Sequence, residues 1–375
     1  MRRGRRRALA GIATASSASL LLATGVVPAA AEEGATGWDR DKNPRRPYVM
    51  VWDDYSEGFD AEGEDAKWWM LQNGHYVGDD GIVSTESGDL NVAASGTNPE
   101  TGEPAFVNTM AQEEDNGGIR GDLDHVKWLA YANHQASTGH TGFDAVPGRE
   151  LSCQTTMSGQ MYGVEDHPFG QRVINAQDDL RLASVGLTVH DVETDMLFEF
   201  LFTNEQVYVF YERLAASRPE LGYYASYLYT IPVADRRPED EHEFRVSYDR
   251  RAGEVEWYLD DELVFDVDDI GPRLDEEYDE YLMLDHGGVE ESVEPRQLAC
   301  GVGSFTIVDG AQPGTDGEGL VKLSTSENHY FDPVLGEPEP MRFMDEESLE
   351  SNRIWGQGAE FTASPLVVSS LPARR

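Results

Sequence analysis

The sequence has few basic residues for its length. Its 375 residues include 29 Lys and Arg against 70 Asp and Glu, a formal net charge of -41 at pH 7. Binding to nucleic acid depends on clustered Lys and Arg that neutralise phosphates and release counterions, so this deficit excludes nucleic acid as a partner. The negative surface also repels other copies of the chain, and we expect a monomer.

Cysteine is scarce as well, since Cys153 and Cys300 are the only two. No C-x-x-C spacing is present, which excludes the usual zinc and redox motifs. Each cysteine lies in a strand-like segment, one over residues 151–155 and the other over 298–302. In an exported protein the two thiols can pair. The sequence therefore leaves two alternatives, a disulfide between them or two separate buried thiols.

After residue 31 the sequence has no apolar run of about 18 residues, the length that a membrane-spanning helix needs, and we expect no membrane partner. The first residues have the layout of a secretory signal peptide, with five arginines before an apolar stretch over 8–27 and three alanines over 29–31. We therefore expect a secreted protein, cleaved near Ala31. Both the Sec and the Tat route stay open.

Amphipathic helices are few and no fixed-period repeat is present, which argues against a βαβ fold and a propeller. From Tyr48 onward, short apolar or alternating runs are separated by Gly, Asp, Asn and Pro, a pattern typical of an antiparallel β protein. We therefore predict an all-β sandwich or barrel. The predicted organisation is a signal peptide over 1–31, a linker over 32–46, a β-sandwich over 47–309 and a C-terminal extension over 310–375 that packs on the sandwich.

The clearest hairpin is predicted over His242–Asp268. Every second residue is apolar over 244–248 and again over 255–259, with a turn at Asp249–Gly253. Alternation with a period of two buries one face of each strand on a core and leaves the other face toward solvent.

The hairpin sequence His242-Glu-Phe-Arg-Val-Ser-Tyr, followed by Trp257-Tyr-Leu-Asp-Asp, resembles the late hairpin of concanavalin A-like lectin and glucanase sandwiches. The chain more closely resembles an uncharacterised family of secreted proteins over residues 48–360. These resemblances imply an all-β, concanavalin A-like antiparallel β-sandwich (jelly roll), and they transfer no activity. The segments that carry the closer resemblance are Asp124–Trp128, Asp179–Ser184, Tyr211–Leu214, Asp285–Gly288 and Ile354–Gly358.

An acidic run over Asp191–Glu199 supplies the candidate catalytic residues. In a strand, the even positions from 192 to 202 face an apolar core, and Glu193, Asp195 and Glu199 share the opposite face. The run resembles, distantly, the strand motif of laminarinase-type glycoside hydrolases, which implies roles as nucleophile, helper and acid/base. Its spacing departs from that motif, because Glu193 and Glu199 lie about 20 Å apart along a straight strand, whereas retaining hydrolysis needs about 5–5.5 Å. Whether the chain is an enzyme stays open.

Aromatic and charged residues on neighbouring segments are the candidate ligand-binding residues. Aromatic faces pack on the C–H surfaces of sugars, while Arg and carboxylates bind hydroxyls. His286 joins them because Asp285 can fix its tautomer and two glycines follow it. The full set is Tyr208, Tyr211, Glu212, Arg213, Tyr227, Tyr229 and His286.

From these residues we expect binding of an extracellular carbohydrate, or a similar polyhydroxylated ligand, on the concave sheet. One alternative is a glycoside hydrolase or lyase that uses Asp195 and Glu199 with Glu193 or His286. The other is a small-molecule-binding or isomerising protein with an aromatic pocket. We expect no cofactor and identify no metal ligands. The segment Asp266–Glu277 lacks a ligand and the flanking helices of an EF-hand, and a structural calcium ion elsewhere is left open.

Overall fold

The computed structural model describes residues 46–63, 65–312, 317–331 and 339–373. The predicted signal peptide (1–31) and all but the last residue of the predicted linker (32–46) lie outside these ranges. Within the described ranges, no helix combines the length and the apolar character that crossing a bilayer requires.

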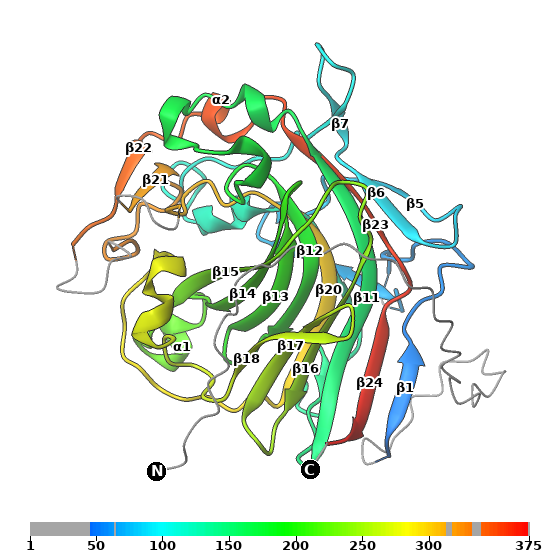
Figure 1. The fold of residues 1–375 in the computed structure, drawn as a ribbon. Helices are drawn as coiled ribbons and strands as arrows, with labels where there is room; N and C mark the ends of the chain where they lie inside the picture. Colours follow the sequence, from blue (N-terminus) through cyan, green and yellow to red (C-terminus); the bar gives the residue numbers. More distant parts are fainter. Residues whose placement is uncertain (1–45, 64, 313–316, 332–338, 374–375) are drawn as a thin grey trace, which may run out of the picture. The chain divides into compact units, whose positions relative to one another are not determined.

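One large sheet, called the first sheet, contains nine antiparallel strands (Figure 1). Its longest strand, β11, pairs with β16 along one edge, and with β24 and β23 in turn along the other. In order across the sheet the strands are β18 (Glu262–Val267), β17 (Glu254–Leu259), β16 (His242–Asp249), β11 (Arg149–Tyr162), β23 (Gly358–Ala363), β6 (Leu90–Ala93) and β5 (Ile82–Ser84), with β24 (Val367–Pro372) beside β11 and β1 (Tyr48–Val51) beside β24.

The second sheet also contains nine antiparallel strands, and β12, β13, β14 and β20 form its centre (Figure 1). Three of its neighbouring pairs, β12–β13, β13–β14 and β14–β15, are consecutive in sequence and form hairpins, whereas the other pairs join strands that are distant in the chain. In order across the sheet the strands are β19 (Leu282–Asp285), β15 (Tyr227–Asp235), β14 (Gln206–Arg213), β13 (Met196–Phe202), β12 (Ser184–Asp191), β20 (Gln297–Phe305), β9 (Val126–Ala132) and β2 (Trp68–Met70), with β10 (Phe143–Asp144) also paired to β20.

The remaining described elements are short and lie in the connections. Strands pair two by two as β3 (Gln72–Asn73) with β4 (Tyr76–Val77), β7 (Gly96–Thr97) with β8 (Pro104–Ala105), and β21 (Glu318–Val321) with β22 (Arg342–Asp345). The helices are α1 (Arg218–Leu221) and α2 (Glu350–Arg353), and the 3₁₀ helices are η1 (Gly121–His125), η2 (Val164–Asp166), η3 (Gly170–Arg172), η4 (Ala176–Asp178) and η5 (Glu276–Tyr281).

The two large sheets pack on each other over one apolar core. The even-numbered residues of β13 are fully buried in it. Phe198 contacts Trp257 of the first sheet with ring centroids 5.9 Å apart, and Phe200 contacts Phe244 at 5.1 Å. The parity predicted over residues 196–202 is therefore confirmed. The two antiparallel sheets and their shared core also confirm the predicted fold class, an all-β antiparallel β-sandwich.

The second sheet is also covered on the face that points away from the first sheet, called the outer face below. Leu201 and Phe210 of the sheet belong to a second buried cluster that includes Ile307, Tyr330 and Phe343 from the chain after β20. Every residue of β13 is buried as a result. A strand buried on both faces has a nearly continuous apolar sequence, and Glu199 is the single charged residue of β13.

The predicted boundary between a sandwich over 47–309 and an extension over 310–375 is wrong. Strands β23 and β24 both pair with β11 in the first sheet. The last described residues therefore complete the sandwich. Their pairing is non-local, and no local feature of the sequence could assign it.

A disulfide joins Cys153 of β11 to Cys300 of β20. Both residues are fully buried, and the bond links the first sheet to the second. Of the two alternatives that the sequence left open, the structure contains the pair.

We predict that replacing both cysteines by alanine lowers the free energy of unfolding by about 2–5 kcal/mol, because the cross-link restricts the unfolded chain across a separation of 147 residues. Urea-induced unfolding of the wild type and of the double variant measures the difference. Wild type unfolded with a reductant is the control, since it loses the cross-link without a change of sequence. Equal unfolding free energies for all three samples would contradict the prediction.

Candidate functional site

The acidic run Asp191–Glu199 is not one strand. Strand β12 ends at Asp191, residues 192–195 form a turn, and β13 begins at Met196. Asp195 has a φ of 60°, a left-handed conformation that Asp tolerates better than most residues. The expectation that Glu193, Asp195 and Glu199 share one strand face is therefore wrong.

The two acids of this turn have other partners. Glu193 forms an ion pair with Arg296 at 2.5 Å near the surface. Asp195 is buried, and it accepts hydrogen bonds from the backbone N–H of Ser217 at 2.6 Å and from the hydroxyl of Tyr224 at 3.0 Å. These contacts stabilise the β12–β13 turn and the segment before α1. They do not bring either carboxylate next to Glu199.

Three of the tyrosines predicted to bind ligand lie in the core instead. Tyr211, Tyr227 and Tyr229 are fully buried between the two sheets. The hydroxyls of Tyr211 and Tyr227 donate to the carbonyl of Pro272, at 3.1 and 2.8 Å. Their role as ligand-binding residues is a wrong prediction, because strand alternation turns them toward the first sheet.

Two further candidates are occupied elsewhere. Arg213 is buried on the same side as these tyrosines, where it forms an ion pair with Glu291 at 2.8 Å and lies 4.0 Å from the ring centre of Tyr224. Tyr208 lies on the outer face, but its hydroxyl donates to Asp178 at 2.9 Å. Of the predicted residues, the structure brings only Glu199, Glu212 and His286 into the polar cluster described next.

Glu199 and Glu212 lie on the outer face of adjacent strands. Glu199 of β13 pairs with Phe210, and Glu212 of β14 pairs with Leu197. The two acids are therefore diagonal neighbours, two residues out of register on the same face. Such neighbours have Cβ atoms about 7–8 Å apart or somewhat less, so the two long side chains can approach each other.

The two carboxyl groups bind protons more tightly than ordinary glutamates. Burial raises the pKa of Glu199 to about 7, although the hydroxyl of Thr188 favours its ionised form. Burial raises the pKa of Glu212 to about 8, and the charge of Glu199 adds to the effect. Two like charges in a poorly solvated place are costly. Near neutral pH the pair therefore holds about one proton between them.

His125 brings a positive charge to this pair. Its Nε2 lies 2.5 Å from the carboxylate of Asp309, which also accepts the hydroxyl of Tyr330 at 2.6 Å. Burial lowers the pKa of His125, but Asp309 outweighs it and raises the value to about 9. The imidazolium acts electrostatically on Glu199 and Glu212, where it favours their ionised forms. Near neutral pH the cluster thus contains one protonated carboxyl group, which can donate a proton, and one carboxylate, which can accept one.

Arg120 and Asp122 stand beside Glu212. Arg120 precedes η1, and its Nε and Nη2 donate to the two oxygens of Asp122 at 3.1 and 2.5 Å. The positive charge of Arg120 favours the ionised form of Glu212, while the negative charge of Asp122 opposes it. The side chains of Arg120 and Asp122 are 30% and 11% exposed, so they connect the buried acids with solvent.

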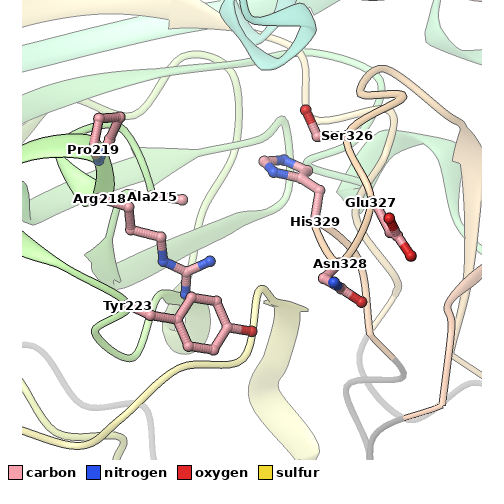
Figure 2. Close-up of a pocket in the computed structure, with 8 residues that line it drawn as sticks. All are labelled: Ala215, Arg218, Pro219, Tyr223, Ser326, Glu327, Asn328 and His329. Carbon is pink, nitrogen blue, oxygen red and sulfur yellow. The ribbon is translucent and has the colours of Figure 1, made fainter.

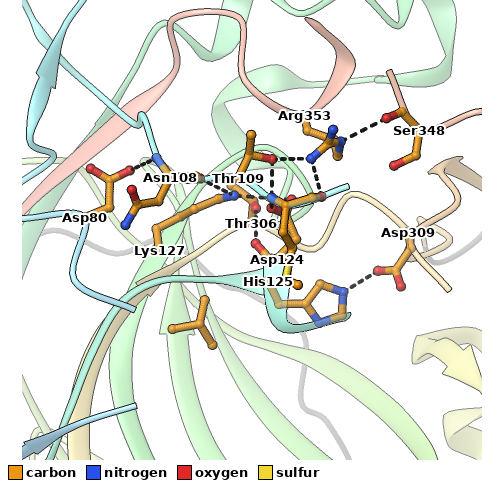
Figure 3. A network of polar contacts seen from close by, with 12 residues as sticks. Asp80, Asn108, Thr109, Asp124, His125, Lys127, Thr306, Asp309, Ser348 and Arg353 are labelled. Carbon is orange, nitrogen blue, oxygen red and sulfur yellow. Dashed lines mark hydrogen bonds and ion pairs between the residues drawn. The ribbon is translucent and has the colours of Figure 1, made fainter. Parts of the chain in front are cut away.

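A buried polar network holds the segment that contains His125 in place (Figure 3). Asp124 accepts the hydroxyl of Thr109 at 2.8 Å and forms a fully buried ion pair with Lys127 at 3.3 Å. Arg353 donates to Thr109 at 2.6 Å. The partners come from three separate parts of the chain, as is usual for buried polar groups, and Lys127 is the contact of the second Asp124 oxygen. The network gives a physical reason for the Asp124–Trp128 motif.

His286 lies with a second histidine at one side of the cluster. The rings of His286 and His329 have centroids 4.3 Å apart, and Nδ1 of His286 contacts the carbonyl of His329. Burial lowers the pKa of both, and that of His329 to about 3, so the two imidazoles are neutral. His329 also lines an open pocket of about 440 Å³ together with Arg218 and Tyr223 (Figure 2).

Several residues of the cluster had no signal as site residues in the sequence. His125 stood in a motif that marked family resemblance, whereas Asp309 lies 184 residues away from it. Within the described residues, no three His, Cys, Asp or Glu side chains converge as metal ligands. The residues that sequence reasoning missed are Arg120, Asp122, His125, Asp309 and His329.

We predict that Glu199→Gln changes how stability depends on pH. Folding raises the pKa of Glu199 from 4.5 to about 7, so its stabilising contribution is fully present below pH 4.5 and is lost as the pH rises to about 7. The wild type should lose on the order of 3 kcal/mol more than the variant between pH 4.5 and 8. Urea unfolding at both pH values measures this loss.

Glu193→Gln is the matched control, because Arg296 lowers the pKa of Glu193 and the variant should show no such relief at high pH. The same pH dependence in wild type and Glu199→Gln would contradict the prediction.

We further predict that Asp309→Asn lowers the pKa of His125 from about 9, because burial then acts without the carboxylate that opposes it most, while Asp122 and Glu212 still favour the charged form. NMR titration of the imidazole C–H signals measures this value. Tyr330→Phe is the control, since it keeps the charge of Asp309 and should leave the pKa of His125 high. An unchanged value in Asp309→Asn would rule out Asp309 as the cause.

Comparisons place this chain among other proteins. Residues 52–372 match the sequence model of a family of unknown function, DUF6081. Uncharacterized protein L829 of Acanthamoeba polyphaga mimivirus is 30% identical over 273 residues, which are 58% of this chain and 58% of that protein, so the chain spans less than two thirds of that relative.

Likeness to solved structures is weak. Alginate lyase A1-II' is 8% identical with a TM-score of 0.36, over 80% of this chain and 86% of that one. A β-glucanase of Bacillus licheniformis is also 8% identical with a TM-score of 0.36, over 88% of this chain and 98% of that one. The sequence family covers most of the chain, whereas the structural matches are distant.

Proposed function

Because this chain belongs to the family of unknown function DUF6081, we propose its function from its own residues: it binds a carbohydrate or similar polyhydroxylated ligand on the outer face of the second sheet and hydrolyses a glycosidic bond there. The observation that carries the proposal is the carboxyl pair Glu199 and Glu212, whose pKa values burial raises to about 7 and about 8. Groups with such values exchange protons near neutral pH, as general acids and bases must.

In the proposed reaction Glu212 is the acid and Glu199 the base. Glu212 gives its proton to the glycosidic oxygen as the bond from that oxygen to the sugar carbon breaks. Glu199 takes a proton from a water molecule whose oxygen forms the new bond to that carbon. This reaction needs carboxyl groups about 6.5–9.5 Å apart, which leaves room for the water, and diagonal neighbours on adjacent strands have Cβ atoms about 7–8 Å apart or somewhat less.

Charged groups around the pair support a polar ligand. The side chains of Arg120, Asp122 and His125 are 30%, 11% and 18% exposed, so each can contact a bound molecule. Sugar hydroxyls both donate and accept hydrogen bonds, and a mixture of carboxylate, guanidinium and imidazolium groups serves both needs. His125 also favours the negative charge that Glu212 acquires when it gives up its proton.

We predict that the protein without residues 1–31 releases new reducing ends from at least one polysaccharide in a panel of neutral and acidic glycans. Glu212→Gln and Glu199→Gln should each lower the rate by about 10²–10⁴-fold, because proton transfer then loses its donor or acceptor. The assay measures reducing sugar, and ultraviolet absorbance identifies any unsaturated product of a lyase.

Glu193→Gln is the control variant, since it removes a carboxylate of the same hairpin that is paired with Arg296 at the surface. It should retain the wild-type rate. Binding of a glycan without any release of sugar would leave a binding protein and overturn the hydrolytic part. Absence of both binding and turnover across the panel would overturn the whole proposal.

A further inference from the structure

An open pocket of about 440 Å³ lies beside α1 and is lined in part by His329 (Figure 2). One wall is the segment around α1, with Arg218 and Tyr223, and the opposite wall is residues 326–329. His329 belongs both to this pocket and to the cluster, since the charges of Asp122 and Asp309 act on its ring. The volume lies in the range of small-molecule sites, about 300–1,000 Å³.

Arg218 differs from its neighbouring arginines in having no acidic partner among the described residues. Arg213 and Arg273 each form an ion pair with a carboxylate. Arg218 instead donates to the backbone carbonyls of Tyr224, His286 and Gly287, at 2.7–3.2 Å. Within the described residues, Arg218 is thus a cation at this pocket without a direct ion pair, although the charge of Asp285 also acts on it.

The guanidinium of Arg218 is held in place. It lies 4.4 Å from the ring centre of Tyr223, and its carbonyl contacts come from two different segments. A guanidinium has five N–H groups. In Arg218, Nε donates one hydrogen bond, Nη1 one and Nη2 two, so one N–H of Nη1 has no acceptor among these contacts. The carboxylate of Glu327 points away from Arg218 in Figure 2. Arg218 is therefore a fixed cation with a donor to spare.

His329 forms the wall of the pocket opposite Arg218. Its imidazole packs against that of His286, with ring centroids 4.3 Å apart, and burial lowers its pKa to about 3. The wall opposite Arg218 therefore carries a neutral ring and adds no second cation to the pocket.

We propose that this pocket binds the carboxylate of an acidic sugar, so that the substrate class of the neighbouring carboxyl pair is a uronic-acid-containing saccharide. The carboxylate accepts from Arg218, a sugar face packs on Tyr223, and the rest of the saccharide lies along the wall that His329 lines. The net charge of -41 repels long polyanions. The ligand is therefore a short saccharide or the end of a chain.

This inference rests on the proposed function, and the first experiment separates the two. Titration calorimetry compares glucuronate- and galacturonate-containing di- and trisaccharides with the matching glucose and galactose compounds, which differ only in the carboxylate. Wild type should bind the acidic compounds at least about tenfold more tightly, because a charge-assisted hydrogen bond to a partly buried guanidinium is lost in the neutral ones.

Variants then test whether Arg218 causes the tighter binding of acidic saccharides. Arg218→Gln should abolish this difference in affinity, and Arg218→Lys should retain part of it. Arg251→Gln, which removes an exposed arginine of the β16–β17 turn and changes the net charge equally, should leave it intact. Because Arg218 also holds backbone carbonyls, circular dichroism and the affinity for the neutral sugars check that each variant is folded.

The outcomes are distinguishable. Equal affinity of wild type for acidic and neutral saccharides, together with turnover that depends on Glu199 and Glu212, would overturn this inference and leave the proposed function in place. A preference for acidic sugars that survives in Arg218→Gln would also overturn it. Failure of every di- and trisaccharide to bind would likewise overturn this inference, whereas the proposed function would still stand or fall on turnover in the polysaccharide panel.

Discussion

Burial of both faces of the second sheet is the constraint on which the rest of this structure depends. The even-numbered residues of β13 pack against the first sheet, and the odd-numbered ones lie beneath the chain that follows β20. A charged residue in such a strand cannot be fully hydrated. Glu199 therefore needs a proton or a compensating cation, and the surrounding polar cluster supplies both.

The cluster compensates its charges in a specific way. Asp309 fixes a positive charge on His125, and this charge opposes the desolvation of Glu199 and Glu212. The compensation is partial, since the pKa values of both glutamates stay above the ordinary one. A structural ion-pair network would instead pair each acid directly, as Asp124 pairs with Lys127 below it. Glu199 and Glu212, which have no direct ion pair with any described residue, therefore belong to the candidate site, whereas the Asp124–Lys127 pair belongs to the structure that holds the site in place.

The sequence predicted the sandwich correctly because strand alternation is a local signal. The hairpin over 242–268 forms as predicted, and the alternation expected over 244–248 and 255–259 falls within β16 and β17. The acidic run failed for a local reason as well. Asp195 adopts a turn conformation with positive φ, so the strand parity that holds from Met196 onward does not extend back to Glu193.

The sequence by itself determined the fold class, the inward parity of β13 and the outward direction of Glu199, since each follows from a period of two along one strand. Only the tertiary structure decided which acids meet. Glu212 stands diagonal to Glu199 through the register of two strands, and Asp309 reaches His125 across 184 residues. Contacts of this kind depend on how segments pack against each other, which no local pattern of residues encodes.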